Sequence, residues 1–284
     1  FADDPETDVG LCYVEGLSDG RDFFERIAAV TRRMPVVVVK GGATSGGQRA
    51  AASHTGSLAS DDRVFDGMAR QAGMLRAATI ESAFEAAATF ASQPLPAGDR
   101  VIVLTTAGGW GVIAADAVTR HPDLTLTPLP ADLLTAIDGM LPPRWSRNNP
   151  VDLAAGETRD TIPELLDLVA AHPDVDSVTQ LGLGIQGNTA AFTRSGPFFP
   201  DHGIGRIVDY HERQEQRYAE ATTAASSRND KPVMVASELA VVRPDNPMVA
   251  AVRGSGRLCY PSADRAVTAL GHLTRYAAWR RARS

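Results

Sequence analysis

The chain has 284 residues, which is enough for one large domain or two ordinary ones. Hydrophobic residues make up 44% and charged residues 22%, a globular composition that excludes a disordered chain. The net charge of −6, with no basic stripe before the last few residues, argues against nucleic acid, and no apolar run is long enough to cross a membrane. Two cysteines, Cys12 and Cys259, without metal-ligand spacing argue against a disulfide framework or a metal site and favour a reducing, cytoplasmic location.

The first third of the chain alternates between strand and helix patterns. Strands are expected at 9–14, 36–39 and 74–76, and helices at 22–33, 61–71 and 79–91. Val36 to Val39 form a run without polar alternation, which is typical of a strand buried on both faces of a parallel sheet. Asp61 or Ser60 is the expected cap of the second helix, and Gly73 its expected end.

A glycine-rich stretch follows the valine run, from Lys40 to Ser57 (KGGATSGGQRAAASHTGS). It predicts a flexible loop that carries one histidine, His54, between two hydroxyl-bearing residues. Small neighbours let the ring move and let other groups approach, and a neutral imidazole is a nucleophile near neutral pH. The pattern therefore indicates a nucleophile that carries a phosphoryl group. On spacing alone, a solvated or hydrogen-bonded histidine with no chemical role is the alternative.

Residues 94–98 (PLPAG) form the expected domain boundary, which gives domains at 1–94 and 99–284. Beyond it, strands are expected at 101–104, 124–126, 175–183, 233–236 and 258–260, and helices at 112–119, 131–140, 161–171, 204–226, 246–253 and 262–281. The alternation predicts an α/β protein with two flavodoxin-like domains, each built on a parallel, doubly wound sheet. Residues 187–217, which begin rich in Gly, Pro and Phe, interrupt it and are expected to be an insertion.

The turn after residues 101–104 reads TTAGGWG and contains Gly108, Gly109 and Gly111. Glycines at the start of a helix let a phosphate approach the backbone amides, and the helix dipole favours an anion there. Close packing of the helix on the strand is the alternative explanation for the same glycines.

The stretch around the histidine, 51–59 (AASHTGSLA), resembles the phosphohistidine segment of the NDP-forming acyl-CoA synthetases, which are relatives of succinyl-CoA synthetase. Four other stretches resemble the same family: 11–16 (LCYVEG), 101–116, 149–153 (NPVDL) and 264–267 (DRAV). Trp110 departs from the pattern, because the family usually has proline there. The resemblance implies two succinyl-CoA-synthetase-like ligase domains over nearly the whole chain.

The resemblance also implies an activity, in which acyl-CoA, phosphate and NDP interconvert with a carboxylic acid, CoA and NTP. His54 would carry the phosphoryl group, Glu15 would face its ring and fix the tautomer, and the turn with Gly108, Gly109 and Gly111 would hold phosphate. Coenzyme A, ATP or ADP, and Mg²⁺ would be bound mainly by CoA-binding and ATP-grasp domains, which are not recognisable in this sequence, so we expect a fragment or one subunit. A homo-oligomer is also expected.

Two other readings of the sequence remain. A catalytically inactive ligase-like module could sense acyl-CoA or a nucleotide, and a flavodoxin-like pair could be purely structural. Retention of His54 in its full motif favours the enzyme, because a sensor needs no nucleophile. For Glu15 the alternative is a solvated carboxylate at the end of a strand.

Overall fold

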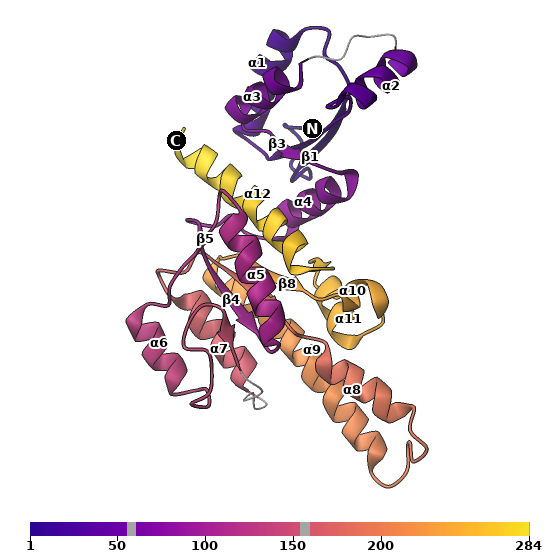
Figure 1. The fold of residues 1–284 in the computed structure, drawn as a ribbon, viewed down its shortest axis with the longest axis vertical. Coiled ribbons are helices and arrows are strands. Elements are labelled where there is room, and N and C mark those ends of the chain that lie inside the picture. The colour runs from indigo at the N-terminus through magenta and orange to yellow at the C-terminus, as the bar shows by residue number, and fades with distance from the viewer. Residues whose placement is uncertain (56–60, 154–159, 284) are drawn as a thin grey trace. The chain divides into compact units, whose positions relative to one another are not determined.

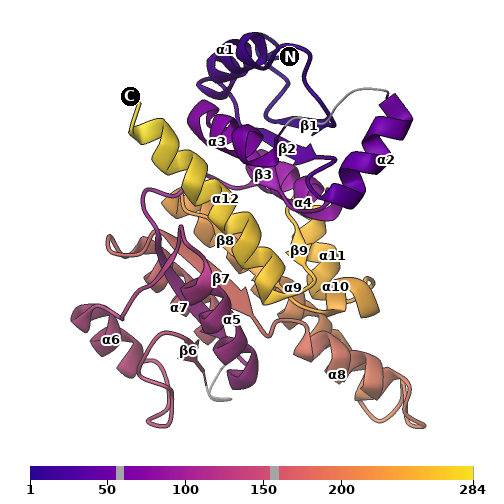
Figure 2. The ribbon, with the colours of Figure 1, turned by 45° about the horizontal axis from the view of Figure 1, so that its top comes forward.

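The computed structural model describes residues 1–55, 61–153 and 160–283. It contains two compact units, which are Phe1–Ser92 together with Arg275–Ser284, and Gln93–Thr274. Each unit has its own parallel sheet and its own covering helices (Figures 1 and 2). The predicted α/β class with parallel sheets is confirmed. The domain boundaries at 94 and 99 stay a prediction, although residues from Arg275 onward group with the first unit.

The first unit is built on a three-stranded sheet in the order β1-β2-β3. Its elements are β1 (Gly10–Val14), α1 (Gly20–Thr31), β2 (Val36–Lys40), α2 (Ser45–Thr55), α3 (Asp62–Ala72), β3 (Leu75–Ala77) and α4 (Ile80–Ser92). Val36 and Val38 pack with α3, while Val37 points to the opposite face and is also fully buried. Burial of the valine run on both faces is therefore confirmed.

Helix α3 begins and ends where the sequence indicates. The Asp61 side chain accepts hydrogen bonds from the amides of Arg63 and Val64, and Gly73 ends the helix with φ +76°. A side chain at Gly73 would also clash with the Trp279 ring, which lies against it. Trp279 Nε1 donates to the Gln71 carbonyl at 3.2 Å. These contacts explain why the last residues of the chain belong to the first unit.

The second unit has the strand order β5-β4-β7-β8-β9, with β6 paired to β4 and every pair parallel. Its strands are β4 (Arg100–Thr105), β5 (Thr125–Leu126), β6 (Val151–Asp152), β7 (Ser177–Leu181), β8 (Val233–Ala236) and β9 (Cys259–Tyr260). Its helices are α5 (Gly108–Arg120), α6 (Ala131–Asp138), α7 (Thr161–Ala171), α8 (Ile185–Arg194), α9 (Ile204–Asn229), α10 (Leu239–Val242), α11 (Pro247–Gly254) and α12 (Ala263–Arg281), whose last residues join the first unit. This is the flavodoxin order, whose direction reverses between β4 and β7. Ligands of such sheets bind beyond the carboxyl ends of the strands at that reversal.

Helices α8 and α9 pack against each other, and α8 with the first part of α9 extends from the second unit (Figure 1). The sequence pattern predicted no helix before residue 204 in this stretch, but the structure has helix α8 there. The Glu215 carboxylate, which is almost fully buried, accepts hydrogen bonds from the amides of Gly184 at 2.7 Å and Gly187 at 3.0 Å, and so supports the start of α8. Burial raises the pKa of the Glu215 carboxyl, although these backbone hydrogen bonds act to lower it. That residues 187–217 are an insertion stays a prediction.

Within the described ranges, no helix is long and apolar enough to span a membrane.

Candidate functional site

Strands β1 and β2 of the first unit end side by side, because Val14 is the register partner of Lys40. Glu15 follows the first of these strands directly. The Tyr13 hydroxyl donates a hydrogen bond to Glu15 Oε1 at 3.0 Å, and this bond raises the pKa of the tyrosine. Residues two apart in an extended chain lie on the same face, so the contact between Tyr13 and Glu15 follows from the local strand geometry. Glu15 therefore has a defined neighbour, Tyr13, which the sequence did not single out.

Lys40 ties the ends of these two strands together. Its ammonium donates to the carbonyl oxygens of Glu15 at 2.7 Å and Gly41 at 2.5 Å, and lies 5.6 Å from the centre of the Phe65 ring. Only 7% of the residue is exposed, and burial lowers its pKa. The side chain thus fixes the backbone that carries Glu15. A lysine ending a run of four valines was the available signal, and the prediction missed it.

The predicted loop from Lys40 to Ser57 was wrong over residues 45–55, which form helix α2. The Thr44 hydroxyl accepts from the Gly47 amide at 3.1 Å, so the glycines lie in the first turn, where they cost least. Arginine and three alanines, strong helix formers, follow at 49–52. His54 is the penultimate residue of α2, but its side chain and residues 56–60 lie outside the described residues. The pairing of His54 with Glu15 therefore stays a prediction.

In the second unit, α5 begins at Gly108, four residues earlier than expected, at the carboxyl end of β4. Its N-cap residue, Ala107, makes no side-chain capping bond. The amides of Trp110 and Gly111 donate to the Ala107 carbonyl at 3.0 and 3.3 Å. No described residue accepts from the amides of Gly108 or Gly109, so these two are open to a ligand.

The three glycines of this turn have different surroundings. A Cβ at Gly109 would have nothing within 4 Å, so the approach to its backbone is open. A Cβ at Gly111 would meet Thr105 Cγ2 at 2.9 Å and Pro150 Cβ at 3.3 Å. The geometry therefore supports a packing role at Gly111 and leaves room for an anion at Gly109.

Asp152 is a further residue of this site that the sequence did not predict. A Cβ at Gly108 would clash with its carboxylate, so Asp152 lies against the first turn of α5. Strand β6 brings it there, with Asp152 as the register partner of Thr105. A carboxylate next to a helix N-terminus is favourable for the helix but repels a second anion. An incoming phosphate would consequently meet the Gly109 side of the turn.

Asn149, in the NPVDL stretch, holds the loop before Asp152. Its side-chain amide donates to the carbonyls of Val101 at 2.7 Å and Thr127 at 2.8 Å, and its side-chain oxygen accepts from the Val103 amide at 2.9 Å. The amide nitrogen and the amide oxygen of this side chain thus join the loop to β4 and to the residue that follows β5. Asn149 is a structural residue that positions Asp152.

Two family models match the chain, one for each unit. Residues 1–90 match the succinyl-CoA ligase like flavodoxin domain, and residues 101–186 match the ligase-CoA domain. The two units therefore contain a succinyl-CoA ligase like flavodoxin domain and a ligase-CoA domain, as the resemblance indicated.

Individual relatives agree with this assignment. The chain is 31% identical over 282 residues to the alpha subunit of an ADP-forming acetate–CoA ligase I of Pyrococcus furiosus, an alignment that covers 99% of the chain and 55% of the relative. An acetyl-coenzyme A synthetase 1 of Ca. Korarchaeum cryptofilum in its apo form gives a TM-score of 0.77 at 27% identity, over 99% of this chain and 55% of that one. The same enzyme in complex with phosphate and ADP gives 0.72 at 29% identity, again over 99% and 55%. The chain thus spans about half the length of these relatives.

Proposed function

We propose that these 284 residues are the phosphoryl-carrying part of an ADP-forming acyl-CoA synthetase, with His54 as the carrier. The observation that carries the proposal is the 31% identity to an acetate–CoA ligase alpha subunit along almost the whole chain. The ordered cluster of Glu15, Tyr13 and Lys40, in the unit that contains His54, supports it.

The reaction has three steps. An oxygen of inorganic phosphate attacks the thioester carbonyl of acyl-CoA, so a C–O bond forms, the C–S bond breaks, and CoA leaves as a thiolate that takes up a proton. The unprotonated imidazole nitrogen of His54 then attacks phosphorus, an N–P bond forms, and the carboxylate leaves. An oxygen of NDP finally takes the phosphoryl group and restores the imidazole.

Each residue of the chain has a physical task in these steps. Glu15 accepts a hydrogen bond from the other ring nitrogen of His54, which fixes the tautomer and stabilises the positive charge that develops on the ring. Lys40 holds the main chain of Glu15 in place. The free amides of Gly108 and Gly109 bind phosphate, with Gly111 packing the helix behind them.

The proposal includes partners beyond these residues. In the parts of the chain that are described, no group of three His, Cys, Asp or Glu side chains could hold a metal ion. We assign Mg²⁺, which would neutralise charge on the nucleotide phosphates, to an ATP-grasp domain or subunit, and CoA to a CoA-binding domain or subunit, as the family resemblance implies. A homo-oligomer and a cytoplasmic location complete the proposal.

The test is incubation of the chain with ATP, Mg²⁺ and the CoA-binding and ATP-grasp partners, followed by analysis of protein-bound phosphate. Acid-labile phosphate on His54 is expected, and it should be discharged by a carboxylic acid with CoA. The 284 residues alone should not complete the cycle. Stoichiometric nucleotide or acyl-CoA binding without any phosphorylation would instead identify a sensing module.

Replacing Glu15 with glutamine should slow phosphorylation of His54 by about 10²-fold and change substrate affinity little, because it removes charge stabilisation of the ring. Rapid-quench measurement of phosphohistidine formation would separate the two effects. Glu25→Gln on α1 is the matched control, since Glu25 is exposed and forms an exposed ion pair with Arg21 at 3.3 Å. A normal phosphorylation rate in Glu15→Gln would show that Glu15 is a surface carboxylate without a catalytic role.

A further inference from the structure

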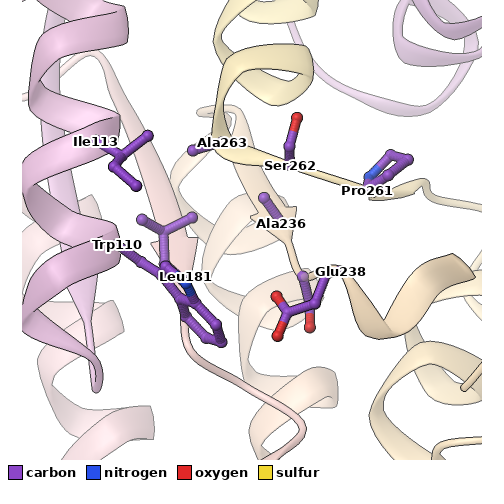
Figure 3. Close-up of a pocket in the computed structure, with 9 residues that line it drawn as sticks. Trp110, Ile113, Leu181, Ala236, Glu238, Pro261, Ser262 and Ala263 are labelled. Carbon is purple, nitrogen blue, oxygen red and sulfur yellow. The ribbon is translucent and has the colours of Figure 1, made fainter. Parts of the chain in front are cut away.

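A pocket of about 360 Å³ lies wholly within the second unit, between α5 and the start of α12 (Figure 3). Its floor is formed by the carboxyl ends of β7 and β8, at Leu181 and Ala236. Trp110 and Ile113, on successive turns of α5, form one wall. The volume is in the range of small-molecule sites, roughly 300 to 1,000 Å³, which are mostly apolar with a few polar groups. None of the residues given a task in the proposed phosphoryl transfer is among those that line this pocket.

The polar side chains of the pocket differ in how much of their hydrogen-bonding capacity is already used within the protein. The Ser237 hydroxyl is buried, accepts from the Leu239 amide at 3.3 Å and donates to the Leu183 carbonyl at 3.4 Å, so it is already used. Glu238, the next residue, is exposed at the rim and makes no side-chain capping bond to α10. No residue in the described ranges donates a hydrogen bond to its carboxylate. Glu238 is therefore the group available to a ligand.

Figure 3 shows the Trp110 ring and the Glu238 carboxylate reaching into the same space from α5 and from the end of β8. Tryptophan is the aromatic side chain that attracts cations most strongly, and a carboxylate adds a full negative charge. The described lining contains one carboxylate and no lysine, arginine or histidine. An anionic ligand would meet repulsion here without any compensating charge.

We propose that this pocket binds a small organic cation, an amine with a compact apolar body. The ammonium contacts Glu238 and the face of Trp110, and the apolar body packs on Ile113, Leu181 and Ala236. Such a ligand differs in charge from every substrate of the proposed reaction, all of which are anions. The pocket is accordingly a second binding site, for an effector or an additional substrate, beside the helix that begins at Gly108.

Three probes with the same phenyl-ethyl skeleton test whether the pocket prefers a cation: 2-phenylethylamine, 2-phenylethanol and 3-phenylpropionate. Each is titrated into the complete 284-residue chain, with binding followed by NMR shifts of the protein. The amine should bind about fivefold more tightly than the alcohol, as expected for one exposed cation–π contact with one ion pair, and the acid should bind most weakly. Equal affinities for the amine and the alcohol, or no saturable binding of the amine, would overturn the proposal.

Two variants locate the site. Glu238→Gln should lower amine affinity about two- to threefold and leave the alcohol unchanged, which reduces the preference to the part that the Trp110 contact contributes. Glu164→Gln, an equal charge change at an exposed position on α7 away from the pocket, should keep the full preference. An amine preference that is undiminished in Glu238→Gln would show that the cation binds elsewhere. Because no turnover is measured, a negative result leaves the proposed phosphoryl transfer untouched.

Discussion

Replacing His54 with alanine should reduce acyl-CoA formation by at least roughly 10⁴-fold in the assembly with its CoA-binding and ATP-grasp partners, because loss of a covalent nucleophile cannot be compensated by positioning alone. Stability should change little, since alanine is the better helix former at the penultimate residue of α2. The measurement is steady-state turnover together with acid-labile phosphate on the protein. Both should disappear in the variant.

The matched control is Arg49→Ala on the same helix. Arg49 is exposed, and its replacement tests whether a change in α2 by itself disturbs the reaction. Full turnover is expected in the control, and circular dichroism should show both variants folded. If folded His54→Ala is phosphorylated at the wild-type level, His54 is not the phosphoryl carrier, and the proposed function is wrong.

The strands other than β6, and most helices, could be predicted because their signals are local; residues 149–152 had indicated a turn, but 151–152 form β6. Four consecutive valines indicated a strand buried on both faces, and Asp61 and Gly73 indicated the two ends of α3 by the hydrogen bonds they make. Helix α2 was missed because its glycines suggested a loop, although they lie in its first turn. Helix α8 was missed for another reason. Its start depends on the Glu215 carboxylate, about thirty positions further along, and a contact of that kind has no local pattern.

The candidate site could be predicted only where a family pattern pointed to it. Glu15, His54 and the glycine turn were indicated by resemblance, whereas Asp152 is brought to Gly108 by the pairing of β6 with β4. That pairing joins segments more than forty residues apart, and neither sequence by itself determines it. The Tyr13 contact with Glu15 was within reach, because alternation along a strand puts both on one face.

The glycine turn gives the sharpest test of phosphate binding, because Gly109 has open space around its Cβ position whereas Gly111 is closely packed. Gly109→Val should reduce phosphorylation of His54 by about 10²-fold, the order of loss seen when one donor to a developing anion is removed. The branched side chain would stand over the free amides of Gly108 and Gly109 and keep phosphate away from them. Stability should change by less than about 1 kcal/mol, because nothing within 4 Å obstructs the new Cβ and valine is not worse than glycine in a helix.

Gly67→Val on α3 is the matched control for Gly109→Val. Gly67 is also a helical glycine with nothing within 4 Å of the added Cβ, but it lies inside the helix, away from any free amide. It should have wild-type phosphorylation and a similar melting temperature. If the glycines of α5 serve only packing, both variants should phosphorylate normally, and any loss should follow their melting temperatures. A folded Gly109→Val protein with a normal rate of phosphoryl transfer, and an unchanged KM for phosphate, would therefore show that phosphate does not bind at this turn.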